Sequence, residues 1–364
     1  MKINIAVYGS GIGLQMFDAW YAFKQSQSKY KTDIEVSITP ERQSADLNIL
    51  FSYNPSHLKT NEYDLVFFCN GGETLQVGTD YMQQHLEKDN CYLIANSYVT
   101  VDHQLHDKIV WFPHNIQTCR DFWTRHFYPQ YFENAVNQNL NRTESIMIIN
   151  GENRSWRNHV FSQLGNINTH SLLSRAVTTT NHAPWESTQD TEYREFVNEQ
   201  YSLERPKDNY YTNAVDIGID KKFGPANPGY FVMPEYYTHH CVVFPESTWQ
   251  NNELAITEKA LKCFYAGSIP FPVGGANINA LYNKLGFSTA WNLLPKDMRA
   301  YDSNTHHASR VEQTVNAIRW LSLNSNVFHS TECNAMQQHN FAQFLNNQIE
   351  HDAILKLDRV LGNL

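Results

Sequence analysis

Short apolar segments recur along this chain of 364 residues, and turns or helical stretches separate them. The first, Ile3–Tyr8, is followed by the glycine-rich turn Gly9–Gly13 and by apolar residues at helical spacing, a pattern that predicts a strand, a turn and a helix. Further segments of this kind are Ile34–Ile38, Leu47–Phe51, Leu65–Phe68, Tyr92–Ala95 and Ile109–Phe112. Strands that alternate with helical or loop stretches predict an α/β domain with a mostly parallel sheet.

A second series of such segments begins after the polar run Asn137–Glu144, which is typical of a linker. Strands are predicted at Ile146–Ile149, Asn213–Ile217, Cys241–Phe244 and Ile269–Val273, and helices at Ser155–Leu164, Thr257–Ala266 and Arg310–Leu321. The segment Ala335–Leu361 has the apolar spacing of an amphipathic helix. Since domains usually have about 100–200 residues, we expect two α/β domains and a C-terminal helix.

The composition argues against several classes of protein. The formal net charge is −9, whereas broad nucleic-acid-binding surfaces use Lys and Arg to neutralise phosphates. The longest apolar stretches, such as Leu65–Cys69, are too short to span a bilayer, and the first residues lack the pattern of a signal peptide. The six cysteines form no CxxC pair, so reduced thiols are expected. We therefore expect a cytoplasmic protein without a membrane span.

The glycine-rich turn Gly9–Gly13 (GSGIG) has two interpretations. It is close to the GxGxxG fingerprint of dinucleotide-binding domains, but the sixth position is Leu14. Such a domain also needs an acidic residue after the second strand to hold a ribose, and only Asp33 and Glu35 are near. The favoured interpretation is a tight turn that lets strand and helix approach closely, with a dehydrogenase as the alternative.

The stretch Cys241–Gly275 carries the most chemical information. A predicted strand is followed by the polar cluster Glu246–Thr248, a loop, and Thr257–Lys259 (TEK) at the start of a predicted helix. The threonine is a typical N-cap residue, and Gly267 is expected to end the helix. The stretch therefore predicts a strand–loop–helix–strand unit with a carboxylate and a lysine at the helix N-terminus.

A helix N-terminus of this kind suits a nucleoside diphosphate. Free backbone N–H groups and the helix dipole favour phosphate. Lys259 adds a cation, and Glu258 can accept hydrogen bonds from ribose hydroxyls. The alternative is an ordinary helix whose first turn carries a capping carboxylate and a solvated lysine. The residues of this helix alone leave both interpretations open.

The stretch Cys241–Gly275 resembles the α1,3-fucosyltransferases (glycosyltransferase family 10). The signature of that family runs from a strand through Glu-Asn-Ser, a short loop and Val-Thr-Glu-Lys to a helix and Ala-Gly-x-Val/Ile-Pro. This chain has FPEST, AITEK and YAGSIPFPVGG in the same order. Related sequences occur among phage and bacterial transferases. The resemblance implies a GT-B-like fold, in which two Rossmann-like α/β domains face each other across a cleft.

Two further segments resemble that family in the expected order. Arg157–Leu164 (RNHVFSQL) resembles a helix whose arginine meets the donor diphosphate, and Val66–Glu73 (VFFCNGGE) resembles a strand and a loop that supplies the catalytic carboxylate. The resemblance thus implies an acceptor-side domain at residues 1–140 and a nucleotide-sugar (donor) domain at 141–334. The C-terminal helix at 335–364 would pack back toward the first domain.

The implied mechanism is an inverting transfer, which needs a general base and stabilisation of the leaving diphosphate. Glu73 is the first candidate for the base, and His57, Asp80 and His114 are reserves. Each of these four side chains has an ordinary alternative as a solvated or satisfied polar group.

The donor is expected to be held by residues of the second domain. These residues are Arg157, Glu246, Ser247, Thr257, Glu258 and Lys259. Arg157 and Lys259 would hold the diphosphate in place of a metal, since no DxD motif with suitable spacing is present, so neither a metal nor a cofactor is expected. Ser247 stands where the family has asparagine, and Ala255 where it has tyrosine, which leaves the donor sugar open and a GDP-sugar favoured.

We therefore expect a metal-independent glycosyltransferase that moves a sugar from a GDP-fucose-like donor to a hydroxyl of a glycan acceptor. One alternative keeps this chemistry but transfers the sugar to a modified DNA base in a phage. Another is a nucleotide- or glycan-binding module that keeps the fold without turnover.

Overall fold

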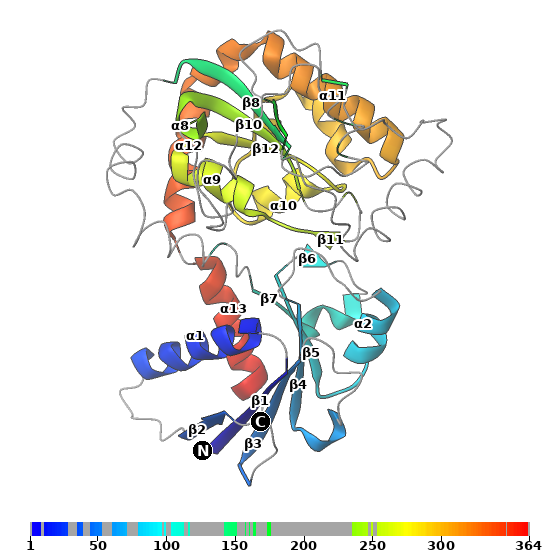
Figure 1. Cartoon of the computed structure of the whole chain (residues 1–364), viewed down its shortest axis with the longest axis vertical. Coiled ribbons are helices and arrows are strands. Elements are labelled where there is room, and N and C mark those ends of the chain that lie inside the picture. The colour runs from blue at the N-terminus through cyan, green and yellow to red at the C-terminus, as the bar shows by residue number, and fades with distance from the viewer. Residues whose placement is uncertain are drawn as a thin grey trace. The chain divides into compact units, whose positions relative to one another are not determined.

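A computed structural model of the chain describes residues 2–8, 11–27, 35–38, 44–52, 60–70, 79–96, 98–99, 103–112, 116, 142–150, 157, 160, 163–164, 173–175, 235–246, 249, 253–346 and 348–362. The chain divides into two compact units (Figure 1). The first comprises Met1–Gln117 and Asn347–Leu364, and the second comprises Thr118–Asn346.

The first unit contains a six-stranded parallel sheet with strand order β2-β1-β3-β4-β5-β7. Its strands are β1 (Lys2–Tyr8), β2 (Glu35–Ile38), β3 (Leu47–Ser52), β4 (Leu65–Asn70), β5 (Cys91–Ala95) and β7 (Ile109–Trp111), and β6 (Tyr98–Val99) is a short strand. Its helices are α1 (Gly11–Gln27), α2 (Thr79–Leu86) and α13 (Gln348–Gly362), with short 3₁₀ helices η2 (Thr60–Glu62) and η3 (His103–Lys108).

Helices cover both faces of this sheet, with α1 and α13 on one side and α2 on the other (Figure 1). The first face buries aromatic side chains, among them Phe51 and Phe67, whose rings stack with centroids 5.1 Å apart. The side chain of Asp358 on α13 joins the two helices: it accepts a hydrogen bond from Trp20 Nε1 at 2.9 Å and pairs with Lys24 at 2.7 Å.

Gly13 lies in the first turn of α1, where the helix approaches the sheet. A Cβ atom at this position would lie 2.4 Å from Cδ1 of Phe51 and 2.8 Å from Sγ of Cys69. These distances leave no room for a side chain, so the glycine permits close packing of helix on strand. The predicted close approach of strand and helix is confirmed at this position, but Gly11–Gly13 belong to α1 and not to a turn, and residues 9 and 10 lie outside the described residues.

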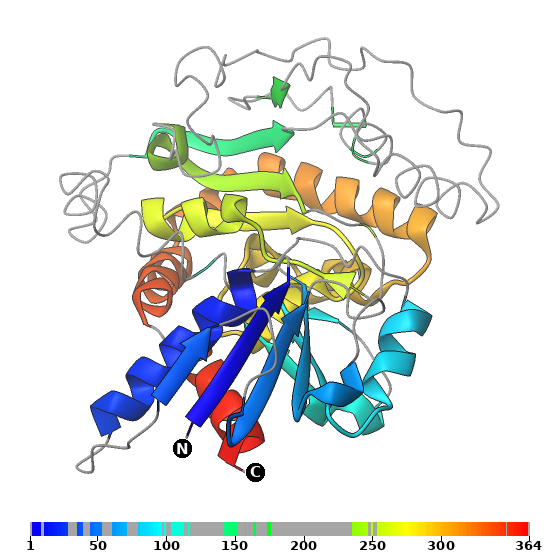
Figure 2. The same cartoon turned by 60° about the horizontal axis from the view of Figure 1, so that its bottom comes forward.

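The second unit contains a four-stranded parallel sheet with strand order β12-β10-β8-β9 (Figure 2). Its strands are β8 (Glu144–Asn150), β9 (Leu173–Arg175), β10 (His239–Pro245) and β12 (Ile269–Val273), and β11 (Glu253–Leu254) is a short strand. Its helices are α8 (Glu235–Thr238), α9 (Glu258–Ala266), α10 (Ile278–Lys284), α11 (His307–Leu323) and α12 (Thr331–Leu345), with 3₁₀ helices η5 (Ala290–Leu293), η6 (Lys296–Ser303) and η7 (Ser325–His329).

Alternate residues of this sheet face α11 and form the core of the second unit. Val243 and Phe271 from the strands pack there with Val315 and Ile318 from the helix. Helix α9 lies against β12 and ends at Gly267, which adopts the left-handed conformation with φ 72°. The predicted end of this helix is thereby confirmed.

The C-terminal segment forms two helices where one was expected. Helix α12 ends at Leu345, Asn346 has an extended backbone, and α13 begins at Gln348. Phe344 of α12 packs on Tyr265 in the second unit, whereas Leu357 of α13 belongs to the core of the first. The break is needed because the two halves of the segment bury their apolar residues in different cores.

The predicted fold class is confirmed in its two α/β units with parallel sheets. The predicted strand at 213–217, most of the helix at 155–164 and the boundary near residue 140 lie outside the described residues. Within the described part of the chain, no helix is long and apolar enough to cross a membrane, and the cysteines at 69, 91, 241, 263 and 333 are buried and free.

Candidate functional site

The order of strands in the second unit reverses beside β8. The strand that follows β8 along the described chain, β9, pairs on one side of it, and β10 pairs on the other side. In open α/β sheets, ligands bind outside the carboxyl ends of the strands at such a reversal. These ends are Asn150 on β8 and Pro245 on β10. Topology alone therefore indicates a binding site near these two residues.

Arg157 and Glu246, two of the predicted donor-binding residues, lie together at this reversal. Both are buried, and Nη2 of Arg157 donates a hydrogen bond to the backbone oxygen of Glu246 at 2.8 Å. The backbone N–H of Glu246 donates to Val273 O, at the end of β12, at 2.8 Å. The backbone of Glu246 is thus held by Arg157, which follows β8 in the sequence, and by Val273 at the end of β12.

The side chain of Glu246 accepts a hydrogen bond from the hydroxyl of Tyr282 on α10. Burial raises the pKa of Tyr282 well above its usual value, and the charges of Glu246 and Glu258 raise it further. The tyrosine therefore stays a neutral donor. Glu258, at the start of α9, is thus one of the two carboxylates whose charge acts on this hydroxyl.

Thr257 lies at the N-cap position of α9, as predicted, but its hydroxyl does not cap the helix. The side chain is fully buried, and its oxygen has no hydrogen-bond partner among the described residues. A buried hydroxyl without a partner costs about 1–3 kcal/mol. An oxygen-rich ligand at this helix N-terminus would supply the missing partner, together with acceptors for the first backbone N–H groups.

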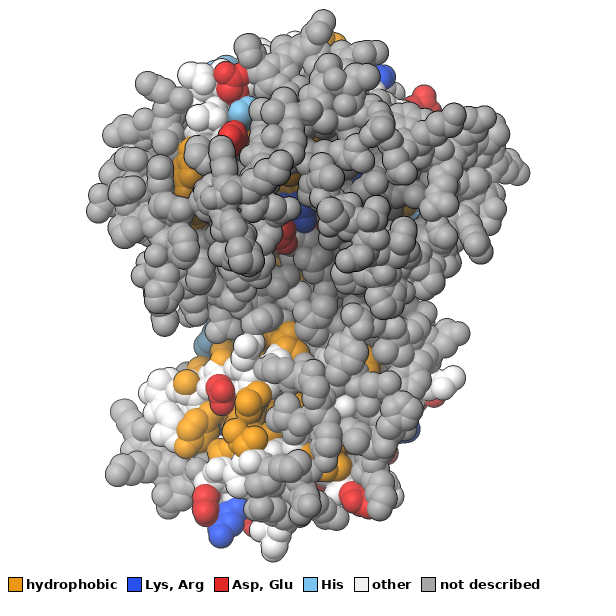
Figure 3. Space-filling view, viewed as in Figure 1, with side chains coloured by type: hydrophobic (Ala, Val, Ile, Leu, Met, Phe, Trp, Pro, Cys, Tyr) orange, Lys and Arg blue, Asp and Glu red, His pale blue; other side chains and the backbone are white. Residues whose placement is uncertain are grey.

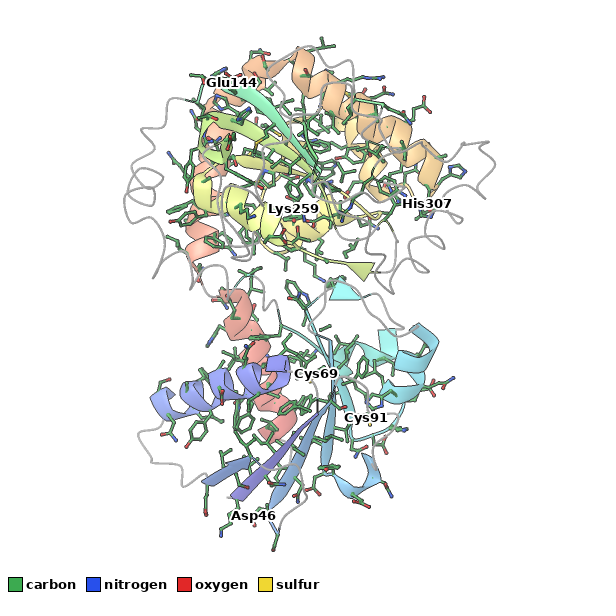
Figure 4. All side chains as sticks on the ribbon, in the orientation of Figure 1. Asp46, Cys69, Cys91, Glu144, Lys259 and His307 are labelled. Atoms are coloured by element: carbon green, nitrogen blue, oxygen red, sulfur yellow. The ribbon has the colours of Figure 1, made fainter. Side chains whose placement is uncertain are left out.

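Glu258 and Lys259 form an ion pair at the start of α9, with Nζ of Lys259 3.1 Å from Oε1 of Glu258. Burial alone would raise the pKa of Glu258, but Lys259 and Lys262 hold it below its usual range, so the carboxylate is charged. Figure 4 shows Lys259 on α9, and Figure 3 shows basic and acidic atoms side by side at this place. Both side chains are partly exposed: that of Lys259 is 15% accessible and that of Glu258 is 24% accessible.

Other predicted site residues lie outside what the structure describes. These are Glu73, the first candidate for the base, Ser247 of the donor site, and the reserves His57 and His114. Asp80 belongs to α2, but its side chain is not among those described. The roles proposed for these residues stay predictions.

Several buried residues with polar groups in the second unit were not predicted from the sequence. They are Trp249, Tyr282, Asp302 and Arg310. Tyr282 and Glu246 are 36 positions apart, and no motif connects them. The available signal was an arginine inside the apolar pattern of a predicted helix at 310–321, because arginine is rarely buried unless it is paired.

No protein-family model matches the sequence, and no curated protein matches it. Among solved structures, a crystal structure of an α1,3-fucosyltransferase aligns with 100% of this chain and 90% of its own, at 13% identity and a TM-score of 0.49. A crystal structure of an α1,3-fucosyltransferase with GDP-fucose covers 99% of this chain and 91% of its own, at 13% identity and a TM-score of 0.48. A UDP-GlcNAc 2-epimerase from Neisseria meningitidis, bound to UDP-GlcNAc, covers 99% and 100%, at 8% identity and a TM-score of 0.35. The chain is thus similar to these structures over nearly its whole length.

Proposed function

We propose that this protein is a glycosyltransferase that uses a nucleoside-diphosphate sugar, and that its second unit binds this donor. The observation that carries the proposal is the convergence of three features at one reversal of strand order. They are the buried pair of Arg157 and Glu246, the N-terminus of α9, and the hydroxyl of Thr257, which has no hydrogen-bond partner in the described part of the chain. The order of FPEST, TEK and AGSIP along the chain supports the same assignment.

The diphosphate would bind at the N-terminus of α9. Backbone N–H groups of the first turn and the hydroxyl of Thr257 would donate to its oxygens. Lys259 would exchange part of its interaction with Glu258 for the phosphate charge, and Arg157 would add a second positive charge in a site shielded from water, where charges interact more strongly. Two cations would thus serve in place of a metal, so the proposed enzyme is metal-independent and has no cofactor.

The sugar and the ribose would lie near the carboxylates of Glu246 and Glu258. Glu258 would accept hydrogen bonds from ribose hydroxyls, and Glu246, with Ser247 beside it, would contact the sugar. Because Tyr282 and Arg157 already hold Glu246, its carboxylate needs little rearrangement to receive a hydroxyl. Such preorganisation favours binding, since less conformational entropy is lost.

The reaction would be an inverting transfer. An acceptor hydroxyl oxygen forms a bond to the anomeric carbon while the bond from that carbon to the diphosphate breaks, and the nucleoside diphosphate leaves. A general base takes the hydroxyl proton, and Glu73 is the proposed base. A GDP-sugar is the favoured donor, with fucose as the sugar of the resembling family, and a glycan hydroxyl is the favoured acceptor.

Donor hydrolysis tests this proposal without knowledge of the acceptor. The purified protein would be incubated with GDP-fucose, GDP-mannose, UDP-glucose and UDP-GlcNAc, and released nucleoside diphosphate would be measured by ion-exchange chromatography. Release from one donor above a boiled control, and its loss in Lys259→Ala, is the expected result. Binding of a nucleotide without release from any donor, even with oligosaccharide acceptors added, would instead indicate a non-catalytic binding module.

A further inference from the structure

Arg310 of α11 contacts residues from separate parts of the second unit. Its Nη2 donates to the backbone oxygen of Trp249, three positions after Glu246, at 2.9 Å. Its Nη1 donates to the backbone oxygen of Asn304, just after η6, at 2.8 Å. Its guanidinium also stacks on the Trp249 ring, 4.4 Å from the ring centroid. Figure 4 labels His307 at the start of α11, and Nδ1 of this histidine lies 3.2 Å from Nη2 of Arg310.

The position of Arg310 is unfavourable for the stability of the helix itself. The side chain is fully buried in the first turn of α11, where the positive end of the helix dipole opposes a cation. Burial of a charge also carries a desolvation cost, which carbonyl contacts and an aromatic face only partly offset. An apolar residue at this position would carry a smaller desolvation cost. This indicates that Arg310 positions the residues that it contacts more than it stabilises the fold.

The same guanidinium lies near the group that fixes α10. The carboxylate of Asp302 on η6 accepts hydrogen bonds from the backbone N–H groups of Asn279 and Ala280, each at 2.9 Å, and so caps this helix. Arg310 binds the backbone oxygen of Asn304, two positions after Asp302, and its charge lowers the pKa of Asp302, which burial raises. Helix α10 carries Tyr282, the hydrogen-bond donor to Glu246.

Two contacts on which Glu246 depends therefore involve Arg310. Trp249, three positions after Glu246, is held by Arg310 directly. The helix whose tyrosine donates to the Glu246 carboxylate is capped by Asp302, two positions before the Asn304 carbonyl that Arg310 binds. A shift of Arg310 would move Trp249 and, through Asn304 and Asp302, the hydroxyl that orients the Glu246 side chain.

We propose that Arg310 is a positioning residue of the donor site, which holds Trp249, three positions after Glu246, and the helix of Tyr282 in the arrangement that the donor sugar nucleotide requires. This role rests on the proposed function. In this role Arg310 would not touch the phosphate or the sugar, and it would act through Trp249 and, by way of Asn304, through Asp302. Its planar fork is needed because two carbonyls and a ring face are engaged at once, which the single ammonium of lysine does not reproduce.

The test is calorimetric titration of wild type, Arg310→Lys and a matched control, Arg142→Lys, with the sugar nucleotide that the wild type hydrolyses. Arg142 is a partly buried arginine of the second unit, and it donates to the backbone oxygens of Tyr236 and His239 at 2.9 and 2.6 Å. It contacts the amino end of β10, whereas the donor site lies at the carboxyl end. Titrations are run well below the melting temperature of each variant.

We expect Arg310→Lys to raise the dissociation constant of the sugar nucleotide roughly three- to thirtyfold, with a binding stoichiometry near that of the wild type. Arg142→Lys should lower the melting temperature and leave the dissociation constant unchanged. A purely structural role for Arg310 predicts a different result, in which the stoichiometry falls with the folded fraction and the dissociation constant is that of the wild type; this would overturn the proposal.

A second variant and the wild-type titration distinguish failure of the positioning role from failure of the proposed function. If Arg310→Lys does not fold, Trp249→Phe tests the same contact from the other side, since it keeps an aromatic core residue but reduces the stacked face. A smaller increase of the dissociation constant supports the role of Arg310, and an unchanged constant overturns it. A wild type that binds no sugar nucleotide overturns the proposed function and this role together, whereas binding by the wild type that neither variant alters overturns the positioning role alone.

Discussion

The hydroxyl of Tyr282 donates a hydrogen bond to the carboxylate of Glu246, and both side chains are buried at the carboxyl end of the second sheet. Removal of this hydroxyl in Tyr282→Phe leaves a buried charged acceptor with one donor fewer. We expect the free energy of unfolding to fall by about 1–3 kcal/mol, measured by urea denaturation.

A double-mutant cycle with Glu246→Gln identifies the contact. Because the two side chains interact directly, the effects of Tyr282→Phe and Glu246→Gln should be non-additive by about 0.5 kcal/mol or more. Tyr301→Phe is a control, since its hydroxyl accepts only a long hydrogen bond of 3.3 Å from Asn279. Additive effects of the two changes would show that the pair does not interact in solution.

Gly13 is expected to tolerate no side chain. In Gly13→Ala, the new methyl group would meet the Phe51 ring and the Cys69 sulfur. Helix α1 must then move away from the sheet, at a cost of about 1–3 kcal/mol. The control Gly362→Ala, at the end of α13, has nothing within 4 Å and should leave stability unchanged or slightly higher. Thermal unfolding compares the two, and equal melting temperatures would contradict the close packing of α1.

His240 should make the protein sensitive to mild acid. Its ring stacks on Phe328, and neither ring nitrogen has a hydrogen-bond partner among the described residues. Burial, together with the charges of Arg142, His329 and His239, lowers its pKa from 6.5 to about 4. Below pH 6.5 the unfolded chain therefore binds a proton that the folded chain does not bind until about pH 4.

Because the unfolded chain binds this proton at a higher pH than the folded chain, the free energy of unfolding falls as the pH decreases from 6.5 to about 4. At pH 5, His240 alone should lower it by about 1–2 kcal/mol. His240→Phe should reduce the loss of stability between pH 7 and pH 5, measured by urea denaturation at each pH. An equal loss in the variant and the wild type would show that His240 is protonated or exposed in the folded state.

Local signals allowed much of the second unit to be predicted from the sequence. The β12 strand was predicted with the bounds that it has, and α9 begins one residue after the predicted start, at Glu258. The helix is marked by residues at its own ends, a threonine at the N-cap and Gly267 at the C-cap, and the strand is followed by Gly274 and Gly275. The short apolar strands of the first sheet were found by another local signal, because burial on both faces leaves an uninterrupted apolar run.

The contacts that build the candidate site could not be predicted in this way. Arg310 and Trp249 are 61 positions apart, and nothing in the spacing of either residue indicates the other. The C-terminal segment shows a related limit. Its apolar spacing predicts helix throughout, but the break at Asn346 depends on which core each half enters, and that is a property of the folded chain.

The central claim is that the N-terminus of α9 binds the phosphates of a nucleotide. Isothermal titration of the purified protein with GDP, UDP, CDP and ADP tests it most directly, with Lys259→Ala and, as a control, Lys284→Ala, an exposed lysine at the end of α10. We predict one-to-one binding of one nucleoside diphosphate, weakened about tenfold or more in Lys259→Ala and unchanged in Lys284→Ala. Absence of binding to all four nucleotides, or equal affinities of the two lysine variants, would contradict the account.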